Sequence, residues 1–547
     1  MKKLFYLIVL LLFVFLSISL SVAAQTAQDT IAQKIDNLFK NYQGKASPGA
    51  IVAVLRGDSL LFLKGYGMAN LEYSIANESN TVYYICSLAK QFTAYAVLLL
   101  AKEHKLGLDD DIRIYLPWMH DFGKKITIRN LLHHTSGIRD DLSLLKIGGI
   151  SSNGIISQEL ALSTLKRQRT LNFPPGEQMS YSNSNYILLA EIVKAASGKS
   201  FRRFTDSAIF EPLHMKHSHF YENPAEIIPD RAVSYTAASP GQYQNSAQNV
   251  YTIGDGGLFM PMSDMMLWVQ NFFHNKIGTE KDIELLNEKG RLNNGKEVSN
   301  TTMNIKGWDV LAYNGGLNGY KTFITIYPNS KTGFIVFANN GDDNTYNLMY
   351  PLADLFITGK QTALSSEQPI PAFKDSSVMR KYSGEYLADD NLYFQFYTDS
   401  GKLYLKQGSR EPLIQKTRDT FIYPGNHRIS FVFSAKGNLT FITPDQQLTM
   451  NRYDLKRKYT DTELSAYTGA YYCDELDCRY EIVLRDHQLL LSCNKFPDTY
   501  INLWDADNLK NDALLGHFNI LRNAAHAVTG FEINNGNLMR LYFQKIK

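Results

Sequence analysis

Ser87 and Lys90 are the residues whose types and spacing most directly suggest chemistry. They stand three positions apart in "ICSLAKQFTA", just before the apolar run "YAVLLLAKEH", and residues three apart share one face of a helix. A serine hydroxyl is a weak nucleophile until a base removes its proton, and a desolvated lysine can act as that base. Free N–H groups at a helix start favour the developing negative charge. The pattern predicts a buried helix with nucleophile Ser87 and base Lys90 in its first turn.

A second polar group follows the turn "PPG" (174–176) in "PPGEQMSYSNSNYILLAEIV". Tyr181, Ser182 and Asn183 are expected on a loop before a helix that restarts at "NYILLAEIV". A phenol there can relay a proton to a leaving group, and an amide can hydrogen-bond a substrate. Ser182 or Asn183 also fits the simpler role of a helix cap. Both roles can hold together.

Five motifs, taken in order, resemble one family. They are "SLAK", "LLHHTSGI", "PPGEQMSYSNSNYILLAEIV", "GDGGLFMPMSDMMLWVQNF" and "GGLNGYKTFITIYPNSKTGFIVFANNG". The same order occurs in serine hydrolases related to class C β-lactamases, which include penicillin-binding carboxypeptidases, D-aminopeptidases, esterases and β-lactamases. The resemblance extends from about Lys34 to Gly359. It implies a chemistry of the Ser-x-x-Lys type, through an acyl-serine intermediate.

The resemblance also implies a role for each matching residue. Ser87 would form the acyl-enzyme and give one oxyanion N–H, with Lys90 as the base for acylation. Tyr181 would serve in proton transfer to the leaving group and in deacylation, and Asn183 would contact the substrate amide. No metal or cofactor is implied, because nucleophile, base and oxyanion donors are all protein groups.

The third family motif, Lys-Thr-Gly or His-x-Gly, has two possible positions. A literal copy at 331–333 follows "TIYPNS" and precedes "FIVFANN", which predicts a hairpin turn between two strands. We therefore align the motif with "YNGGLNGY". The family positions then fall on Tyr313, Asn314 and Gly315, and the second oxyanion N–H would come from Gly316.

That alignment puts an uncharged residue where the family has a cation. Tyr313 is neutral at pH 7, whereas the family's Lys or His helps to hold a substrate carboxylate. Tyr313 or Asn314 can still hydrogen-bond a neutral substrate. A D-amino-acid peptide or an ester is therefore favoured over a β-lactam. The alternative is a catalytically weak penicillin-recognising or cell-wall binding protein on the same fold.

Other reactive residues are expected to be structural. His133 and His134 suggest a metal pair or a catalytic histidine, but a turn after a helix explains them better. Gly256 and Gly257 indicate close backbone approach and not a phosphate loop. Cys86 is expected to point into the core.

The remaining cysteines lie near the C-terminus. Cys473 and Cys478 flank "DELD" between strand-like runs, so a local disulfide is plausible in an oxidising compartment. A zinc site that includes Cys493 is disfavoured by the spacing and by the lack of a histidine.

The elements that would position these residues are strands at both ends of a helical region. "GAIVAVLR" and "SLLFLKGYG" are joined around Arg56-Gly57-Asp58, which fits a hairpin turn better than an adhesion motif. Strands return in "YKTFITIYP" and "GFIVFANNG". This layout predicts an α+β fold of the β-lactamase and penicillin-binding-protein type, with an antiparallel sheet flanked by helices.

The tail has a different pattern, with short strands and polar turns. A weak repeat, Tyr-x-Gly-x-Tyr followed by an acidic turn and an alternating strand, begins at Tyr382 and again at Tyr467. Two small all-β domains of the barrel or lipocalin type are the expected result. The expected organisation is signal peptide 1–24, hydrolase domain 26–359, linker 360–373, and β domains 374–457 and 458–547.

The first residues are typical of an export signal. Lys2 and Lys3 precede the apolar stretch Leu4–Leu20, and "VAA" lies just before Gln25, which predicts cleavage and a periplasmic protein. An uncleaved inner-membrane anchor is the alternative, because the stretch is nearly long enough to span a bilayer. The formal net charge of +3 in 547 residues is too small a basic excess to indicate nucleic-acid binding. A small-molecule or peptide substrate is the expected partner.

Overall fold

The computed structural model describes residues 30–546, apart from 151–152, 240, 300, 306, 342–344, 358–378, 389–391, 407–411, 425, 444–446, 454–457, 494 and 512–515. The expected signal peptide (1–24) and linker (360–373) lie outside the described residues. None of the described helices combines the length and the apolar character needed to cross a bilayer.

The chain forms two compact units, each built from several segments. The first comprises Met1–Leu106, Val193–Lys289 and Ser299–Gln361, and the second comprises Gly107–Ile192, Gly290–Val298 and Thr362–Lys547. Residues 107–192, from the middle of the expected hydrolase domain, therefore group with the β-rich tail.

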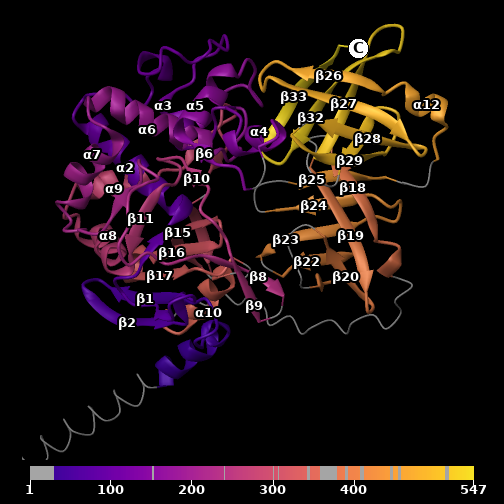
Figure 1. Cartoon of the computed structure of the whole chain (residues 1–547). Coiled ribbons are helices and arrows are strands. Elements are labelled where there is room, and N and C mark those ends of the chain that lie inside the picture. The colour runs from indigo at the N-terminus through magenta and orange to yellow at the C-terminus, as the bar shows by residue number, and fades with distance from the viewer. Residues whose placement is uncertain are drawn as a thin grey trace, which may run out of the picture. The chain divides into compact units, whose positions relative to one another are not determined.

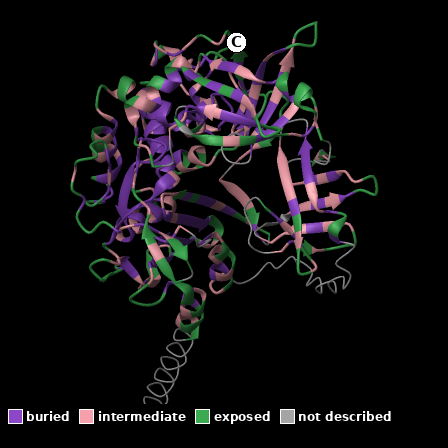
Figure 2. Ribbon diagram, turned by 45° about the vertical axis from the view of Figure 1, so that its right-hand side comes forward, coloured by how far each residue is buried: buried purple, intermediate pink, exposed green. Residues whose placement is uncertain are grey.

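A six-stranded antiparallel sheet is the centre of the first unit (Figure 1). Its strands, in spatial order, are β14 (Thr302–Ile305), β15 (Trp308–Leu317), β16 (Tyr320–Tyr327), β17 (Thr332–Ala338), β1 (Ala50–Arg56) and β2 (Ser59–Tyr66). Because β1 and β17 are covered on both faces, their side chains are buried almost without interruption (Figure 2). The expected strand pairs and the hairpin at Gly57 are confirmed.

Two layers of helix cover this sheet. On one face lies an apolar cluster that includes Val52 and Val336 of the sheet. Ile35 and Phe39, near the start of the described chain, and Leu352 of α10 (Met349–Asp354) belong to the same cluster. On the other face lies α8 (Met262–His274), which contacts β1 and β17, and Phe92 of α2 (Lys90–Lys102) packs on Trp268 of α8. The remaining helices and strands of this unit are η1 (Lys40–Tyr42), β3 (Met68–Asn70), β4 (Ile75–Ala76), β5 (Val82–Tyr84), η2 (Cys86–Ala89), α7 (Phe201–Thr205), η4 (Asp206–Phe210), β7 (His219–Phe220), β8 (Tyr235–Ser239), β9 (Gln242–Asn245), β10 (Val250–Tyr251), β11 (Leu258–Pro261), α9 (Glu280–Leu286), η5 (Pro328–Ser330) and η6 (Thr345–Leu348).

The second unit combines short helices with the β-rich tail. Before the tail come η3 (Ile112–Ile114), α3 (Ile128–Leu132), α4 (Asp141–Ile147), β6 (Ile156–Ser157), α5 (Gln158–Arg167), the start of α6 (Asn183–Ser197), β12 (Gly290–Arg291) and β13 (Glu297–Val298).

The tail folds into two eight-stranded antiparallel sheets. The first sheet contains β18 (Gly384–Ala388), β19 (Tyr393–Asp399), β20 (Lys402–Leu405), β21 (Ile414–Gln415), β22 (Thr420–Tyr423), β23 (Asn426–Phe433), β24 (Leu439–Ile442) and β25 (Gln447–Tyr453). After α12 (Asp461–Ser465), the second sheet closes into a barrel of β26 (Gly469–Cys473), β27 (Cys478–Arg485), β28 (Gln488–Cys493), β29 (Phe496–Leu503), β30 (Asn508–Asn511), β31 (Gly516–Arg522), β32 (Val528–Asn535) and β33 (Leu538–Lys545). The expected fold class, an α+β hydrolase fold followed by barrel-type sheets, is confirmed.

The weak sequence repeat marks equivalent tyrosines in the two sheets. Tyr386 donates from its hydroxyl to the carbonyl of Tyr382 at 3.1 Å, and Tyr471 donates to the carbonyl of Tyr467 at 2.6 Å. The sheets differ in closure, because among the described residues β20 and β21 form the two ends of the first sheet and do not pair.

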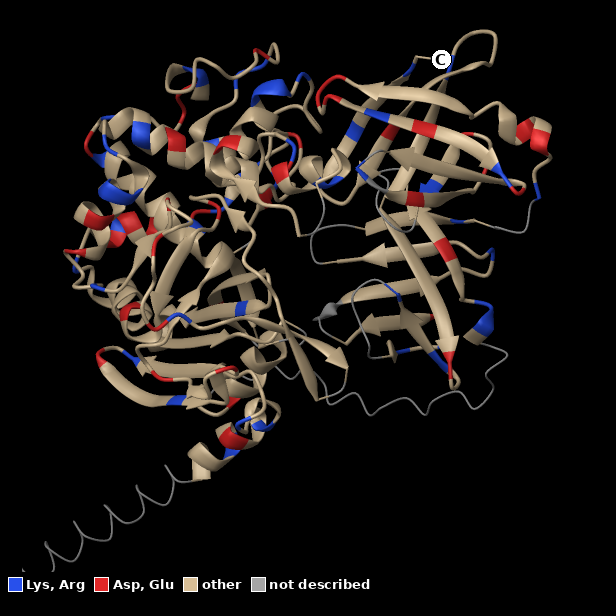
Figure 3. Cartoon of the chain, viewed as in Figure 1, with Lys and Arg blue, Asp and Glu red and all other residues tan. Residues whose placement is uncertain are grey.

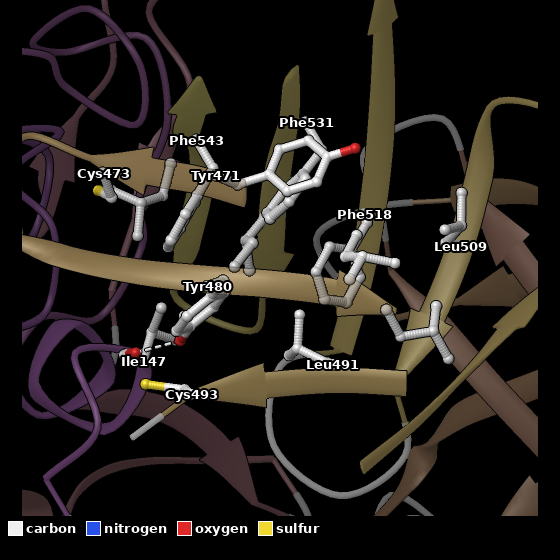
Figure 4. Close-up of a cluster of buried hydrophobic side chains, with 14 of the residues drawn as sticks. Ile147, Tyr471, Cys473, Tyr480, Leu491, Cys493, Leu509, Phe518, Phe531 and Phe543 are labelled. Atoms are coloured by element: carbon white, nitrogen blue, oxygen red, sulfur yellow. Dashed lines mark hydrogen bonds between the residues drawn. The ribbon is translucent and has the colours of Figure 1, made fainter. Parts of the chain in front are cut away.

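Aromatic side chains fill the closed barrel. Tyr471, Tyr480, Phe518, Phe531 and Phe543 belong to its buried cluster (Figure 4). Ring centroids of Tyr471 and Phe531 are 4.8 Å apart, and those of Tyr480 and Phe543 are 4.7 Å apart. As expected for a small barrel, these aromatics form the core and not an exposed binding surface.

The cysteines of the barrel are thiols. Cys473 and Cys478 lie directly opposite each other on β26 and β27, yet both are free and buried. The plausible local disulfide is therefore not formed in this structure.

Candidate active site

Ser87 and Lys90 lie on consecutive turns of one helical segment. Ser87 is part of the 3₁₀ turn η2, and Lys90 is the first residue of α2. Residues three apart eclipse each other in a 3₁₀ turn, and Lys90 Nζ accordingly lies 3.2 Å from Ser87 Oγ. The predicted buried helix and its pair are thus present, with a tighter first turn than the sequence indicated.

The residue before Ser87 has an unusual backbone conformation. Cys86 has a φ of 54°, a left-handed value that costs a non-glycine residue roughly 1–2 kcal/mol, and such strain is common at functional sites. Burial raises the pKa of the Cys86 thiol, so this residue stays protonated and is no competitor to Ser87. The expectation of a core position for Cys86 is confirmed.

A glycine-rich loop holds Lys90. Its Nζ donates a 2.7 Å hydrogen bond to the carbonyl of Asp255, and its side chain is 8% exposed. A Cβ atom at Gly256 would lie 2.5 Å from the hydroxyl oxygen of Tyr84, so the loop can approach only with glycine there. The predicted close backbone approach is confirmed, and its purpose is now visible: it supplies the acceptor for Lys90.

Strand β15 lies against the segment that precedes Ser87. A Cβ atom at Gly315 would be 2.7 Å from the carbonyl oxygen of Ile85 and 2.9 Å from Cys86 Cβ. Thr322 of β16 donates to the same carbonyl at 2.9 Å. The first unit therefore brings the aligned third motif beside the nucleophile.

The residues of that motif face in different directions. Tyr313 is buried, its hydroxyl donates to Asn287, and its ring meets Phe272 edge-on at 6.4 Å. Asn314 and Gly316, by contrast, are exposed. Of the aligned residues, Asn314 and Gly316 are therefore better placed than Tyr313 to meet a ligand.

The literal Lys-Thr-Gly motif is a hairpin turn, as predicted. Lys331 has a φ of 48° and follows the 3₁₀ turn η5, and Thr332 opens β17.

The second unit carries Tyr181 and Asn183. Tyr181 donates from its hydroxyl to Asn183 Oδ1 at 3.3 Å. Asp140 Oδ2 accepts from both the backbone N–H (2.8 Å) and Nδ2 (3.0 Å) of Asn183. The prediction of a loop position for Asn183 was wrong, because α6 already begins there. A carboxylate that accepts the first N–H groups stabilises a helix start, and no motif in the sequence marks Asp140 for this role.

His134 packs against the candidate tyrosine. The ring centroids of His134 and Tyr181 are 4.7 Å apart, and His134 Nδ1 accepts from the backbone N–H of Ser182 at 3.2 Å. The structural interpretation of His134 fits this burial and these contacts. No group of His, Cys, Asp and Glu in the described part of the chain is arranged to hold a metal ion.

Comparison with known proteins decides the family. Residues 35–355 match the Beta-lactamase family model. This chain belongs to the beta-lactamase family. It is a serine hydrolase of the β-lactamase-related class.

Similar proteins include penicillin-binding protein 4* of Bacillus subtilis, 26% identical over 68% of this chain and 86% of that protein. The D-aminopeptidase of Brucella anthropi is 32% identical over 42% of this chain, and the match spans 43% of that enzyme's length. Among solved structures, the octameric penicillin-binding protein homologue from Pyrococcus abyssi aligns with a TM-score of 0.54 at 22% identity, over 78% of this chain and 99% of that one.

A polar contact between Arg139 and the closed barrel is not indicated by any sequence motif. Arg139, fully buried, donates to Glu475 Oε2 at 3.1 Å and to the carbonyls of Met539 (3.2 Å) and Arg540 (3.1 Å) in the closed barrel. Burial lowers the pKa of Arg139, and the Glu475 carboxylate opposes that effect. Only the charged run "RDD" at 139–141 hinted at a role.

The candidate site residues thus fall into two sets. The first unit brings together Ser87, Lys90 and 313–316, and the second unit brings Tyr181 and Asn183 together with Asp140.

Proposed function

We propose that this protein is an exported serine hydrolase that cleaves an amide or ester through an acyl-serine intermediate. The observation that carries the proposal is the contact between Lys90 Nζ and Ser87 Oγ at 3.2 Å. A D-amino-acid peptide or an ester is the preferred substrate class.

In acylation, Lys90 is the base. It accepts the hydroxyl proton as Ser87 Oγ attacks the substrate carbonyl carbon. Negative charge moves to the carbonyl oxygen, where the backbone N–H groups of Ser87 and Gly316 stabilise it. When the intermediate collapses, the bond to the leaving nitrogen or oxygen breaks, and that atom takes a proton relayed through Tyr181. Asn183 holds the substrate amide.

Deacylation repeats these steps with water. Tyr181 assists transfer of a proton from water to Lys90, and the oxygen of that water attacks the acyl carbon. When this intermediate collapses, the bond to Ser87 Oγ breaks and Oγ takes the proton from Lys90, which restores the free enzyme. Protein groups supply every donor and acceptor in this sequence.

The substrate preference is supported by the third motif. Tyr313 is neutral and its hydroxyl is bonded to Asn287, so the usual carboxylate-binding cation is missing from this position. Similarity to D-aminopeptidases supports the same preference.

A substrate panel tests this preference. Purified protein is assayed with matched D- and L-aminoacyl p-nitroanilides, a p-nitrophenyl ester and a chromogenic cephalosporin, with Ser87→Ala as control. We expect kcat/KM for the D-anilide or the ester to exceed that for the cephalosporin by about tenfold or more, a typical pocket discrimination. A cephalosporin that is the best substrate would contradict the proposal.

A weakly catalytic binding protein is the second candidate, and the missing cation at Tyr313 favours it. Such a protein would be acylated once by labelled penicillin and would turn over no substrate of the panel. Steady turnover of any of them excludes this candidate.

Export to the periplasm is part of the proposal and is supported by the sequence of residues 1–24. We expect protein from a periplasmic extract to begin at Gln25. Protein that stays in the membrane fraction with residues 1–24 attached would support the anchored alternative.

A further inference from the structure

We infer that Lys321 binds an anionic group of the substrate and so supplies the cation that is missing at Tyr313. This inference rests on the proposed function and deepens it. It assigns a carboxylate subsite to the exposed face of the β15–β16 hairpin.

Lys321 lies across the candidate oxyanion residue. Gly316 and Lys321 are directly paired between β15 and β16, so their side-chain positions share one face of the sheet. A Cβ atom at Gly316 would lie 3.3 Å from both Cδ and Nζ of Lys321. The absence of a side chain at Gly316 therefore leaves room for the ammonium group.

The charge of Lys321 is not neutralised within the described residues. It is the only charged residue in β16 and β17, in a sheet with few charged residues (Figure 3). The residue is half-buried, and although its backbone is paired within the sheet, its side chain forms no hydrogen bond or ion pair with another residue that the structure describes. Charges removed from water generally have a partner, and a substrate carboxylate would be one.

The positive charge also reaches the nucleophile segment. Burial raises the pKa of the Cys86 thiol, and the charges of Lys321 and Lys90 both oppose that rise. Lys321 therefore lies close enough to act on the residue that precedes Ser87, and the mechanism does not use it.

Asn314 completes the subsite. Side chains alternate along a strand, so Asn314 shares the face of Gly316 and Lys321, while Gly315 faces the backbone of Ile85. Asn314 is exposed, and its amide can donate to a carboxylate oxygen. A substrate whose scissile carbonyl is bound at the Gly316 N–H can therefore place a neighbouring carboxylate at this pair.

The substrate class follows from this placement. A peptide or amide with a free carboxylate close to the scissile bond would be preferred to its neutral analogue. Hydrogen bonds to a charged group are stronger than neutral ones, so we expect removal of Lys321 to raise KM for a carboxylate substrate by roughly tenfold to hundredfold.

The test uses one D-aminoacyl dipeptide as the free acid and as the C-terminal amide. Full-length wild type, Lys321→Met, Lys321→Arg and the control Lys331→Met are compared. Lys331 is exposed and lies at the opposite end of β16. We expect Lys321→Met to raise KM for the acid alone, with kcat nearly unchanged, Lys321→Arg to restore most of the affinity, and Lys331→Met to match wild type. Equal effects on acid and amide, or no effect, would overturn the inference.

A second experiment distinguishes failure of the Lys321 subsite from failure of the proposed hydrolase function. If wild type hydrolyses neither peptide, the acid is tested as a competitor of fluorophosphonate labelling at Ser87. Protection of wild type but not of Lys321→Met supports the subsite. Equal protection of the two proteins, or protection of neither, overturns it.

Discussion

The two parts of the candidate site are held in place by different means. Ser87 and Lys90 are three residues apart, and a single helical turn brings them together. Tyr181 and Asn183 depend instead on Asp140 and His134, more than 40 residues earlier in the chain. Local backbone geometry therefore brings Ser87 and Lys90 together, and hydrogen bonds to Asp255 and from Thr322 then hold that segment. The proton-relay residues are positioned by long-range polar contacts.

The tail takes part in the second arrangement. Arg139 accepts at its carbonyl from Ser184 of α6 (2.8 Å), while its guanidinium binds Glu475. In the same unit, Tyr480 of the barrel donates to the carbonyl of Ile147 in α4 (Figure 4). The closed barrel thus contacts the helical segment that carries Asp140.

The other tail sheet contacts the barrel through a buried ion pair. Lys510 Nζ lies 2.9 Å from Glu385 Oε1, and Trp504 Nε1 donates to Glu385 Oε2 at 2.6 Å. Two sheets with one sequence pattern therefore have different neighbours. We expect changes in the closed barrel to act on Tyr181 through Arg139 and Asp140.

The largest effect, a loss of free energy of unfolding, is expected from Arg139→Met. The variant leaves the Glu475 carboxylate buried without its charge partner, and breaking a buried pair costs about 3–5 kcal/mol. Urea unfolding should show this loss, and Arg139→Met combined with Glu475→Gln should recover part of it. A single variant as stable as wild type would contradict a stabilising role for this contact.

Asp140→Asn should separate the two parts of the site. Loss of the carboxylate misplaces Asn183 and Tyr181, and a misplacement of about 1 Å costs roughly hundredfold in kcat. Fluorophosphonate labelling of Ser87, in which fluoride leaves without a proton, should change little. Asp121→Asn, at an exposed carboxylate, is the control. An equal loss of labelling and turnover would show that the two sets are not independent.

Acid should weaken the second unit through His517 in the barrel. Burial lowers the pKa of His517 to about 4, whereas the unfolded chain has a value near 6.5. As pH falls from about 6.5 to 4 the unfolded state takes up the proton first, so stability is lost across this window and levels off below it. The loss should be on the order of 3 kcal/mol. Urea unfolding at pH 7, 5 and 4 should show a flatter profile for His517→Gln; an unchanged profile would exclude this cause.

The smallest effect is expected from Tyr313→Phe. The variant keeps the ring packing and removes the hydrogen bond to Asn287. Loss of that hydrogen bond should lower the free energy of unfolding by about 1 kcal/mol. Turnover of a neutral ester should stay within about threefold of wild type, since a buried hydroxyl bonded to protein has no ligand to bind. A loss of ester turnover beyond tenfold would show that Tyr313 contacts substrate.

Features set by local spacing could be predicted from the sequence. The Ser87–Lys90 pair, the hairpin at Lys331 and the strands β1 and β17 are all indicated by residues within a few positions of one another.

Contacts between distant residues could not be predicted in this way. Arg139 and Glu475 meet only because the barrel packs on the helical segment, and neither residue lies in a motif. The start of α6 at Asn183 depends on Asp140, and the difference in closure between the two tail sheets depends on whether their end strands pair. These features are decided by tertiary packing, which single-sequence periodicity does not record.

The central claim is that Ser87 is the nucleophile and Lys90 its base. The most direct test is intact-protein mass spectrometry after fluorophosphonate treatment of wild type, Ser87→Ala and Lys90→Met. The account predicts one adduct on the peptide that contains Ser87, no adduct in Ser87→Ala, and labelling slowed by about a hundredfold or more in Lys90→Met. An adduct in Ser87→Ala, or wild-type labelling on another residue, would contradict it.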